Sequence, residues 1–66
     1  MKVIINQKEK DICESINIDE LIKEERISNS GLAIAVNQNI IPKNKWALYL
    51  LKENDNIMII RASHGG

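Results

Sequence analysis

The last residues of the sequence have the clearest potential for chemistry, because they offer a carboxylate with little bulk beside it. The chain reads Ser63-His64-Gly65-Gly66 at its end. A terminal carboxylate is ionised at neutral pH, since its ordinary pKa is about 3.5, and it is a poor electrophile until an enzyme activates it. Glycine has no Cβ, so two consecutive glycines fit a narrow slot in which other residues would clash. We therefore expect a tail on which a larger partner acts.

Cys13 and His64 are the other side chains that could take part in chemistry. Cys13 falls in an expected short strand, without a nearby histidine or cluster of cations that would favour its thiolate. We interpret it as a small strand residue rather than as a nucleophile. His64 could position an activated carboxyl group or contact a partner, but an exposed tail histidine without a chemical duty is the simpler interpretation.

Length and composition exclude several classes of function. The chain has 66 residues, and its 9 basic and 9 acidic side chains cancel. A chain of this size has no room for a deep catalytic cleft, and its charge does not suit binding to nucleic acid. A single cysteine forms no internal disulfide, and Cys13 with His64 is too small a set for structural zinc. The single cysteine fits a reducing cytoplasm. No apolar run suits a signal peptide or a membrane span, so we expect a soluble protein.

The first half of the sequence predicts a hairpin and a helix. Residues 2–5 are rich in β-branched side chains and predict a strand, 6–9 are turn-like, and 10–14 return as a second strand. Asn17 can cap a helix, because Glu20 stands three residues later, as in a capping box. That helix should end near Arg26, before the loop-forming stretch 28–31. Its buried side should hold Ile18, Leu21 and Ile22.

The second half predicts mainly strands. Residues 32–36 form a short apolar run, and 40–41 give a brief strand that Pro42 closes. Asn44 is expected to cap one helical turn through Trp46 and Ala47. Trp46 is expected to pack under the connection at 42–50, with contact to a partner as the alternative. Residues 52–55 form a polar turn, and 56–62 form the last strand.

The order of these elements predicts one α+β domain over residues 1–66, with a flexible tail at 62–66. A helix that crosses from the first hairpin to the third strand would cover one face of a mixed sheet of four or five strands. Order and lengths fit the ubiquitin-like β-grasp fold.

Three stretches resemble the ThiS family, the sulfur carrier proteins of thiamine biosynthesis. Residues 35–43 followed by Trp46 are similar to the family pattern A-V-N-x-x-I-V-P-R-x-x-W, and 51–57 are similar to L-x-x-G-D-x-I. The third stretch is the diglycine end. Asn54 stands where the family pattern has glycine, and it is the next most tolerant residue for a positive φ. Ser63 and His64 replace the small or apolar residues expected before the diglycine.

The resemblance implies a carrier rather than an enzyme, with Gly66 as the modified residue. A ubiquitin-activating-like adenylyltransferase would use ATP and Mg²⁺ to adenylate Gly66, recognising Gly65, His64 and Ser63 beside it. Sulfur from a cysteine desulfurase or sulfurtransferase system would replace AMP, and thiazole synthase would receive sulfur from the thiocarboxylate. The resemblance implies no cofactor bound by the chain itself.

Alternation along the strands predicts a docking surface for these partners. If Ile57 and Ile59 face the helix, then Met58 and Ile60 face the other side of the sheet. Ile4 is expected beside them. One helix cannot cover both faces of such a sheet, so Ile4, Met58 and Ile60 would form an exposed apolar patch close to the tail. Packing under a loop or against a second copy of the chain is the alternative.

Other functions remain compatible with the same residues. The small subunit of molybdopterin synthase carries sulfur on the same kind of tail, although its members are usually longer and lack the stretch at 35–43. A ubiquitin-like protein modifier and an interaction module with an inert tail are further alternatives. An enzyme in its own right is disfavoured, because the sequence offers no acid–base pair, metal-ligand set or phosphate-binding loop.

Overall fold

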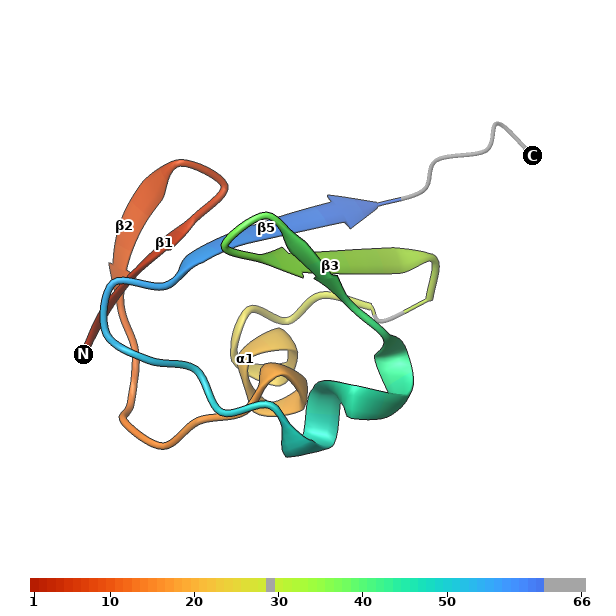
Figure 1. The fold of residues 1–66 in the computed structure, drawn as a ribbon, viewed down its shortest axis with the longest axis horizontal. Helices are drawn as coiled ribbons and strands as arrows, with labels where there is room; N and C mark the ends of the chain where they lie inside the picture. The colour runs from red at the N-terminus through yellow and green to blue at the C-terminus, as the bar shows by residue number, and fades with distance from the viewer. Residues whose placement is uncertain (29, 62–66) are drawn as a thin grey trace.

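The structure, a computed structural model, describes residues 1–28 and 30–61. Within them lie five strands, one α-helix and one 3₁₀ helix (Figure 1). In chain order these are β1 (Lys2–Ile5), β2 (Lys8–Asp11), α1 (Ile18–Glu24), β3 (Leu32–Val36), β4 (Asn39–Ile41), η1 (Lys43–Leu48) and β5 (Asn56–Arg61). The α+β class and the main helix are as predicted.

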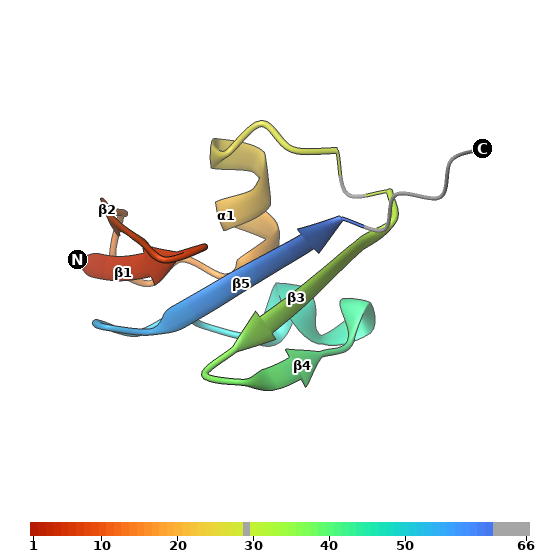
Figure 2. The ribbon, with the colours of Figure 1, turned by 90° about the horizontal axis from the view of Figure 1, so that it is seen from above.

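The five strands of the described chain form one mixed sheet in the order β2-β1-β5-β3-β4. The last strand, β5, therefore lies in the middle of the sheet, parallel to β1 and antiparallel to β3 (Figure 2). Its residue Ile57 stands between Ile5 on one neighbour and Val36 on the other. The parallel β1–β5 pair needs a long crossover, and α1, β3, β4 and η1 supply it.

Two hairpins of the sheet turn on the same dipeptide. Asn6 and Gln7 have φ values of 49° and 71°, and Asn37 and Gln38 have values of 52° and 74°. Positive φ at both central residues is the geometry of a two-residue type I′ turn, whose twist matches that of the flanking strands. Asparagine at the first position tolerates this conformation better than most residues.

The predicted turn at 6–9 and strand at 10–14 were wrong in their bounds. Because the turn takes only two residues, β2 begins at Lys8 and ends at Asp11. Cys13 lies beyond the strand and is exposed. Hydrophobic alternation could not locate this strand, because all its side chains are charged and exposed, as suits the edge of a sheet.

The capping box predicted for the helix is present. Glu20 N–H donates to Asn17 Oδ1 at 2.8 Å, and Asn17 N–H donates to Glu20 Oε1 at 2.9 Å. These bonds satisfy two of the backbone donors that a helix start otherwise leaves free. The helix ends at Glu24, two residues before the predicted end near Arg26. Its buried residues are the three predicted ones, Ile18, Leu21 and Ile22.

The helical segment after β4 starts differently from the prediction. Asn44 was expected to cap it, but η1 spans Lys43–Leu48 and Pro42 stands at its N-cap without a side-chain bond. Pro42 has φ of −59°, and its carbonyl accepts from Lys45 N–H at 2.8 Å, so the proline itself closes the first turn. Trp46 is buried as expected, and its Nε1–H donates to the Ile41 carbonyl at 2.8 Å.

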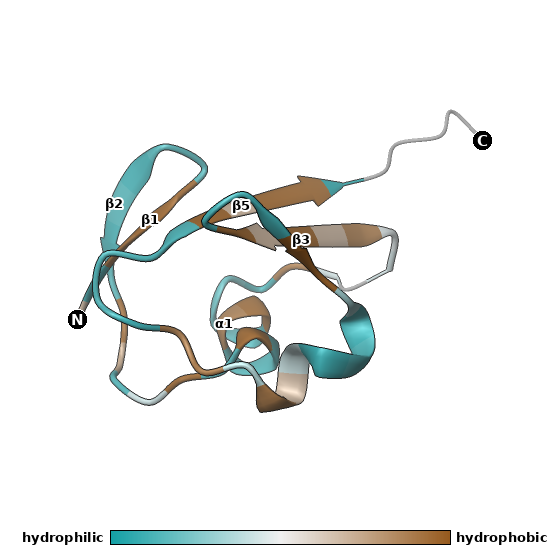
Figure 3. Cartoon of the chain, in the orientation of Figure 1, coloured by the Kyte–Doolittle hydropathy of each residue, from teal (hydrophilic) through white to brown (hydrophobic). Residues whose placement is uncertain are grey.

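The core lies between α1 with η1 on one side and the inner face of the sheet on the other. Figure 3 shows the hydrophobic stretches of β1, β3 and β5 lying together, beside the hydrophilic β2. Burying each large aliphatic side chain contributes about 2 kcal/mol, which a chain of this size needs. The core residues are Val3, Ile5, Ile12, Ile16, Ile18, Leu21, Ile22, Ile34, Val36, Trp46, Leu51 and Ile57.

Candidate functional site: β5 and the open face of the sheet

The central strand β5 runs directly toward the predicted reactive end of the chain. Figure 1 shows it crossing the molecule from the side of the N-terminus toward the opposite side, with α1 and η1 in the layer below the sheet. The last residue of β5 is Arg61, which is exposed. The predicted tail residues Ser63, His64, Gly65 and Gly66 lie outside the described residues.

The face of the sheet opposite α1 exposes apolar side chains, as the alternation predicted. Met58 is 47% exposed and Ile60 is 44% exposed, whereas Ile57 on the same strand is fully buried. Ile4 is half-buried, so it contributes less surface than predicted. Ile59 is partly buried and packs against the core. The structure therefore places Met58 and Ile60 on an open face, and their role there stays a prediction.

The sequence reasoning missed the most exposed apolar side chain of this face. Ile40 on β4 is 71% exposed, and the register places it opposite Ala35, which in turn faces Met58 across the sheet. Alternation within 39–41 could have found it, because Ile41 packs on the core and its neighbour must point the other way. Ala35 and Met58 also line a shallow hollow of about 290 Å³. We call Ile40, Ala35, Met58 and Ile60 the open-face patch.

A polar network fixes the start of β5. Asp55 is only 6% exposed. Its carboxylate accepts from Asn37 Nδ2 at 3.0 Å and from Lys52 N–H at 2.8 Å. Asn37 in turn accepts from Asn56 N–H through its Oδ1 at 3.0 Å. The network joins the β3–β4 turn to the turn before β5, so it links the two internal stretches that resemble the ThiS family.

The turn before β5 confirms the expectation for Asn54. Its φ is 69°, in the left-handed region where glycine is preferred and asparagine is tolerated. Its N–H donates to the Lys2 carbonyl at 2.7 Å, which ties the turn to β1. The departure from the family pattern therefore leaves the turn intact.

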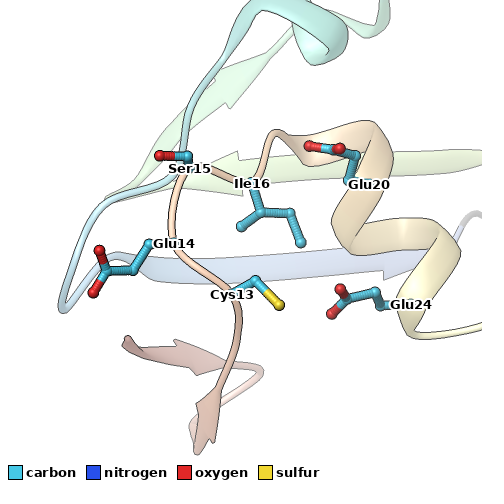
Figure 4. Close-up of a pocket in the computed structure, with 6 residues that line it drawn as sticks. All are labelled: Cys13, Glu14, Ser15, Ile16, Glu20 and Glu24. Atoms are coloured by element: carbon cyan, nitrogen blue, oxygen red, sulfur yellow. The ribbon is translucent and has the colours of Figure 1, made fainter.

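Cys13 lies at a second hollow, of about 200 Å³, next to α1 (Figure 4). The figure shows the carboxylates of Glu20 and Glu24 on the helix side of this hollow and Glu14 on the loop. Reactive cysteines sit in electropositive surroundings, and the residues lining this hollow include carboxylates but no cation. The arrangement does not favour a nucleophile at this position.

Metal and membrane chemistry find no support in the part of the chain that the structure describes. Residues 1–28 and 30–61 contain no group of three or more histidine, cysteine, aspartate or glutamate side chains placed to hold a metal ion. In the same residues, no helix has both the length and the apolar character needed to cross a bilayer.

Comparisons with known sequences agree on one family. The sequence model of the ThiS family matches residues 2–66. The chain is similar to the sulfur carrier protein ThiS of Escherichia coli (strain K12), at 26% identity over 66 residues that cover 100% of both chains. It is also 27% identical over 66 residues to a thiazole synthase of Paramagnetospirillum magneticum (strain ATCC 700264 / AMB-1), of which it spans 20%.

Solved structures show the same fold. A crystal structure of a thiamine biosynthesis protein (ThiS) from Geobacter metallireducens superposes with a TM-score of 0.87 at 19% identity, covering 100% of both chains. A solution NMR structure of a thiamine biosynthesis protein from the same organism gives 0.82 at 20% identity, covering 100% of this chain and 88% of the other. The β-grasp prediction is thereby confirmed. Because the family match extends over almost the whole sequence, the chain belongs to the ThiS family, the sulfur carrier proteins of thiamine biosynthesis.

Proposed function

We propose that the chain carries sulfur as a thiocarboxylate on Gly66. The observation that supports this most directly is the match to a sulfur carrier protein over the full length of both chains, with the family match reaching residue 66. An alignment that extends through the diglycine fits a function of the terminal carboxylate. The chain would then be the substrate of its partners rather than an enzyme.

The first step would make the carboxylate electrophilic. A carboxylate oxygen of Gly66 attacks the α-phosphorus of ATP in an adenylyltransferase similar to ubiquitin-activating enzymes, and pyrophosphate leaves. The partner holds the ATP and Mg²⁺. Gly65 would allow close approach to the nucleotide, because it has no Cβ to clash with the walls of the site. Ser63 and His64 would be recognised beside it.

The second step would exchange AMP for sulfur. The terminal sulfur of a persulfide, provided by a cysteine desulfurase or sulfurtransferase system, attacks the acyl carbon of Gly66 and AMP leaves. An acyl disulfide then joins the carrier to the sulfur donor. A second thiol attacks the donor sulfur, forms a disulfide with it, and releases the thiocarboxylate on Gly66.

Thiazole synthase is the proposed acceptor of this sulfur. A relative that bears the name thiazole synthase contains a segment similar to the whole of this chain, which makes up 20% of its length. A carrier that shares one polypeptide with a synthase supports the same partnership between separate proteins. All these steps would take place in the cytoplasm, where thiols stay reduced.

Intact mass measurement tests the proposed chemistry. The protein is incubated with its cognate adenylyltransferase, ATP, Mg²⁺ and a persulfide donor with a thiol. The expected product has gained the mass difference between one sulfur and one oxygen. The matched control is the chemically synthesised chain with a C-terminal carboxamide, which keeps every residue but lacks the carboxylate. An unchanged mass in the free-acid protein, with an enzyme shown to be active on its own carrier, would overturn the proposal.

The open-face patch is the proposed docking surface, extended from the predicted Ile4, Met58 and Ile60 to Ile40. Ile60→Asp is expected to keep the fold, because the side chain is 44% exposed, and to abolish modification of Gly66 by weakening docking. Leu48→Asp is the matched control, since Leu48 is 79% exposed on η1, in the other layer of the fold. Equal rates of modification for both variants would remove the patch from the proposal.

A further inference from the structure

The strand β5 continues beyond the point at which β1 leaves it. The two strands pair only through Ile4 with Asn56 and Ile5 with Ile57. After Ile5 the chain turns away into the first hairpin, and Figure 2 shows β5 running on without a strand on that side. On the other side, β3 accompanies β5 as far as Arg61.

An asparagine side chain marks the point where β1 leaves. Asn6 N–H donates to the Ile57 carbonyl at 2.9 Å, and Ile59 N–H donates to Asn6 Oδ1 at 2.8 Å. In a continuing parallel ladder the Asn6 carbonyl would accept that second bond. The side chain thus takes the place of the backbone and satisfies the last donor that β1 can reach.

The backbone groups that follow on this side of β5 have no partner among the described residues. The N–H and C=O of a strand residue point to the same side, and residues two apart repeat the direction. Ile57 and Ile59 bond toward β1, so the Ile59 carbonyl and the Arg61 N–H point to the same side. In residues 1–28 and 30–61, no hydrogen bond to either group occurs. Within the described part of the chain, two backbone groups of opposite polarity are therefore without a partner at the edge of β5.

The two outer edges of the sheet, β2 and β4, are less suited to pairing with a further strand. β2 carries only charged, exposed residues along its edge, and such charges discourage a further strand. β4 has only three residues and is followed by Pro42, which cannot donate to a ladder. The edge at Ile59 and Arg61 has neither a row of charged residues nor a proline, and it directly precedes residues 62–66.

We propose that this free edge pairs with an extended backbone segment of the enzyme that adenylates Gly66. The inference rests on the proposed function and names the part of the carrier that the enzyme holds. An N–H and a C=O spaced as in a strand are complementary to another strand, so the occupant is a polypeptide segment rather than a small ligand. The five residues at 62–66 span at most about 17 Å, so a segment paired at Arg61 would set the depth to which Gly66 reaches.

The position of the edge supports the same partner. Met58 and Ile60 of the open-face patch belong to the same strand, and they point out of the sheet while the free groups point along it. An enzyme seated on the patch therefore comes within reach of the edge. A pairing there would fix the direction of the chain before the tail enters the nucleotide site.

Hydrogen exchange at single amides tests the pairing in the wild-type protein. In the free carrier the Arg61 N–H should exchange quickly, because the residue is exposed and its N–H has no partner among residues 1–28 and 30–61. In the complex with the adenylyltransferase, its exchange should slow by at least about tenfold, as for an amide in a ladder. The Ile60 N–H, which points to β3, is the internal control and should be protected in both states. A complex in which Arg61 exchanges as fast as in the free carrier would overturn the inference and leave the proposed function standing.

A pair of variants separates hydrogen bonding from simple burial. Arg61→Pro removes the N–H that faces the free edge and leaves the ladder with β3 intact, whereas Arg61→Ala removes only the side chain. Arg61→Pro should bind the adenylyltransferase about tenfold more weakly than Arg61→Ala, because the hydrogen bond that the Arg61 N–H would donate is lost. Equal affinities would overturn the inference. Absence of binding by the wild-type protein itself would overturn the proposed function and the inference with it.

Discussion

The two ends of β5 are held in different ways. At its start, neighbours bond it from both sides, since Ile4 N–H donates to the Asp55 carbonyl at 2.9 Å and Asn37 N–H donates to the Asn56 carbonyl at 2.8 Å. At its end, β3 alone accompanies it to Arg61. The start of β5, which we call its base, is therefore held by hydrogen bonds on both sides, whereas its end is held on one side among the described residues. Toward Arg61, the part of the chain that the structure describes leaves two backbone groups of β5 without a partner and the side chains of Met58 and Ile60 exposed.

Truncating one isoleucine at each end of β5 should give the largest difference in the free energy of unfolding. Ile57 at the base is fully buried, so Ile57→Ala should lower the free energy of unfolding by about 3 kcal/mol through lost burial and the cavity left behind. Ile60→Ala near the end should change it by less than about 0.5 kcal/mol, because the side chain is 44% exposed. Urea denaturation followed by circular dichroism measures both. Equal losses would contradict the contrast between the ends. If Ile57→Ala does not fold, Ile57→Val should still cost about 1 kcal/mol.

Removal of the buried carboxylate at the base should have the next largest effect. Asp55→Ala leaves Asn37 Nδ2 and Lys52 N–H without their acceptor, and we expect a loss of about 2 kcal/mol in the free energy of unfolding. Glu53→Ala in the same turn is the control. Its carboxylate accepts from Lys2 N–H at 3.3 Å in an exposed position, and the expected loss is below about 0.5 kcal/mol. A variant at Asp55 as stable as the one at Glu53 would show that the network does not hold the base.

The features of β5 that depend on neighbouring residues could be predicted from the sequence. Alternation in 56–62 predicted which isoleucines of β5 are buried, because period-two patterning determines the face of a strand. The capping box at Asn17 and the tolerance of Asn54 for positive φ followed from local chemistry in the same way. These features depend on a few neighbouring residues, so they were accessible without the structure.

Features that join distant parts of the chain were not accessible. The hydrogen bond from Ile59 to Asn6 joins residues 53 positions apart, and no local sequence pattern near either residue predicts it. The sequence predicts Asp55 in a polar turn, but its side chain is buried because Asn37 reaches it from another hairpin. The charged β2 was misplaced because no hydrophobic pattern marks it. The chemistry of Gly66 rests on the family resemblance, and its structure lies outside the described residues.

Substitution of Asn6, whose side chain ends the β1–β5 pairing, should lower stability less than substitution of Ile57 or Asp55 at the base. Asn6→Gly keeps the positive φ of the turn but removes the acceptor for Ile59 N–H, and we expect a loss of about 1 kcal/mol. Asn6→Asp retains an acceptor oxygen and should stay within about 0.5 kcal/mol of the wild-type protein. The amide of Ile59 should exchange faster in Asn6→Gly and not in Asn6→Asp. Unchanged exchange in both would show that this side chain does not close the ladder.

The smallest effect should come from a glycine in the turn that leads into the base of β5. Asn54 has φ of 69°, and a residue with a Cβ is disfavoured there, so Asn54→Gly should raise the free energy of unfolding by about 0.5 kcal/mol. Asn54→Ala should lower it by about 1 kcal/mol, because alanine lacks the tolerance of asparagine for this region. Both variants keep the N–H that donates to the Lys2 carbonyl at 2.7 Å. Opposite signs in urea denaturation would therefore isolate backbone conformation as the cause. The same sign for both would mean that the asparagine side chain itself holds the base of the strand.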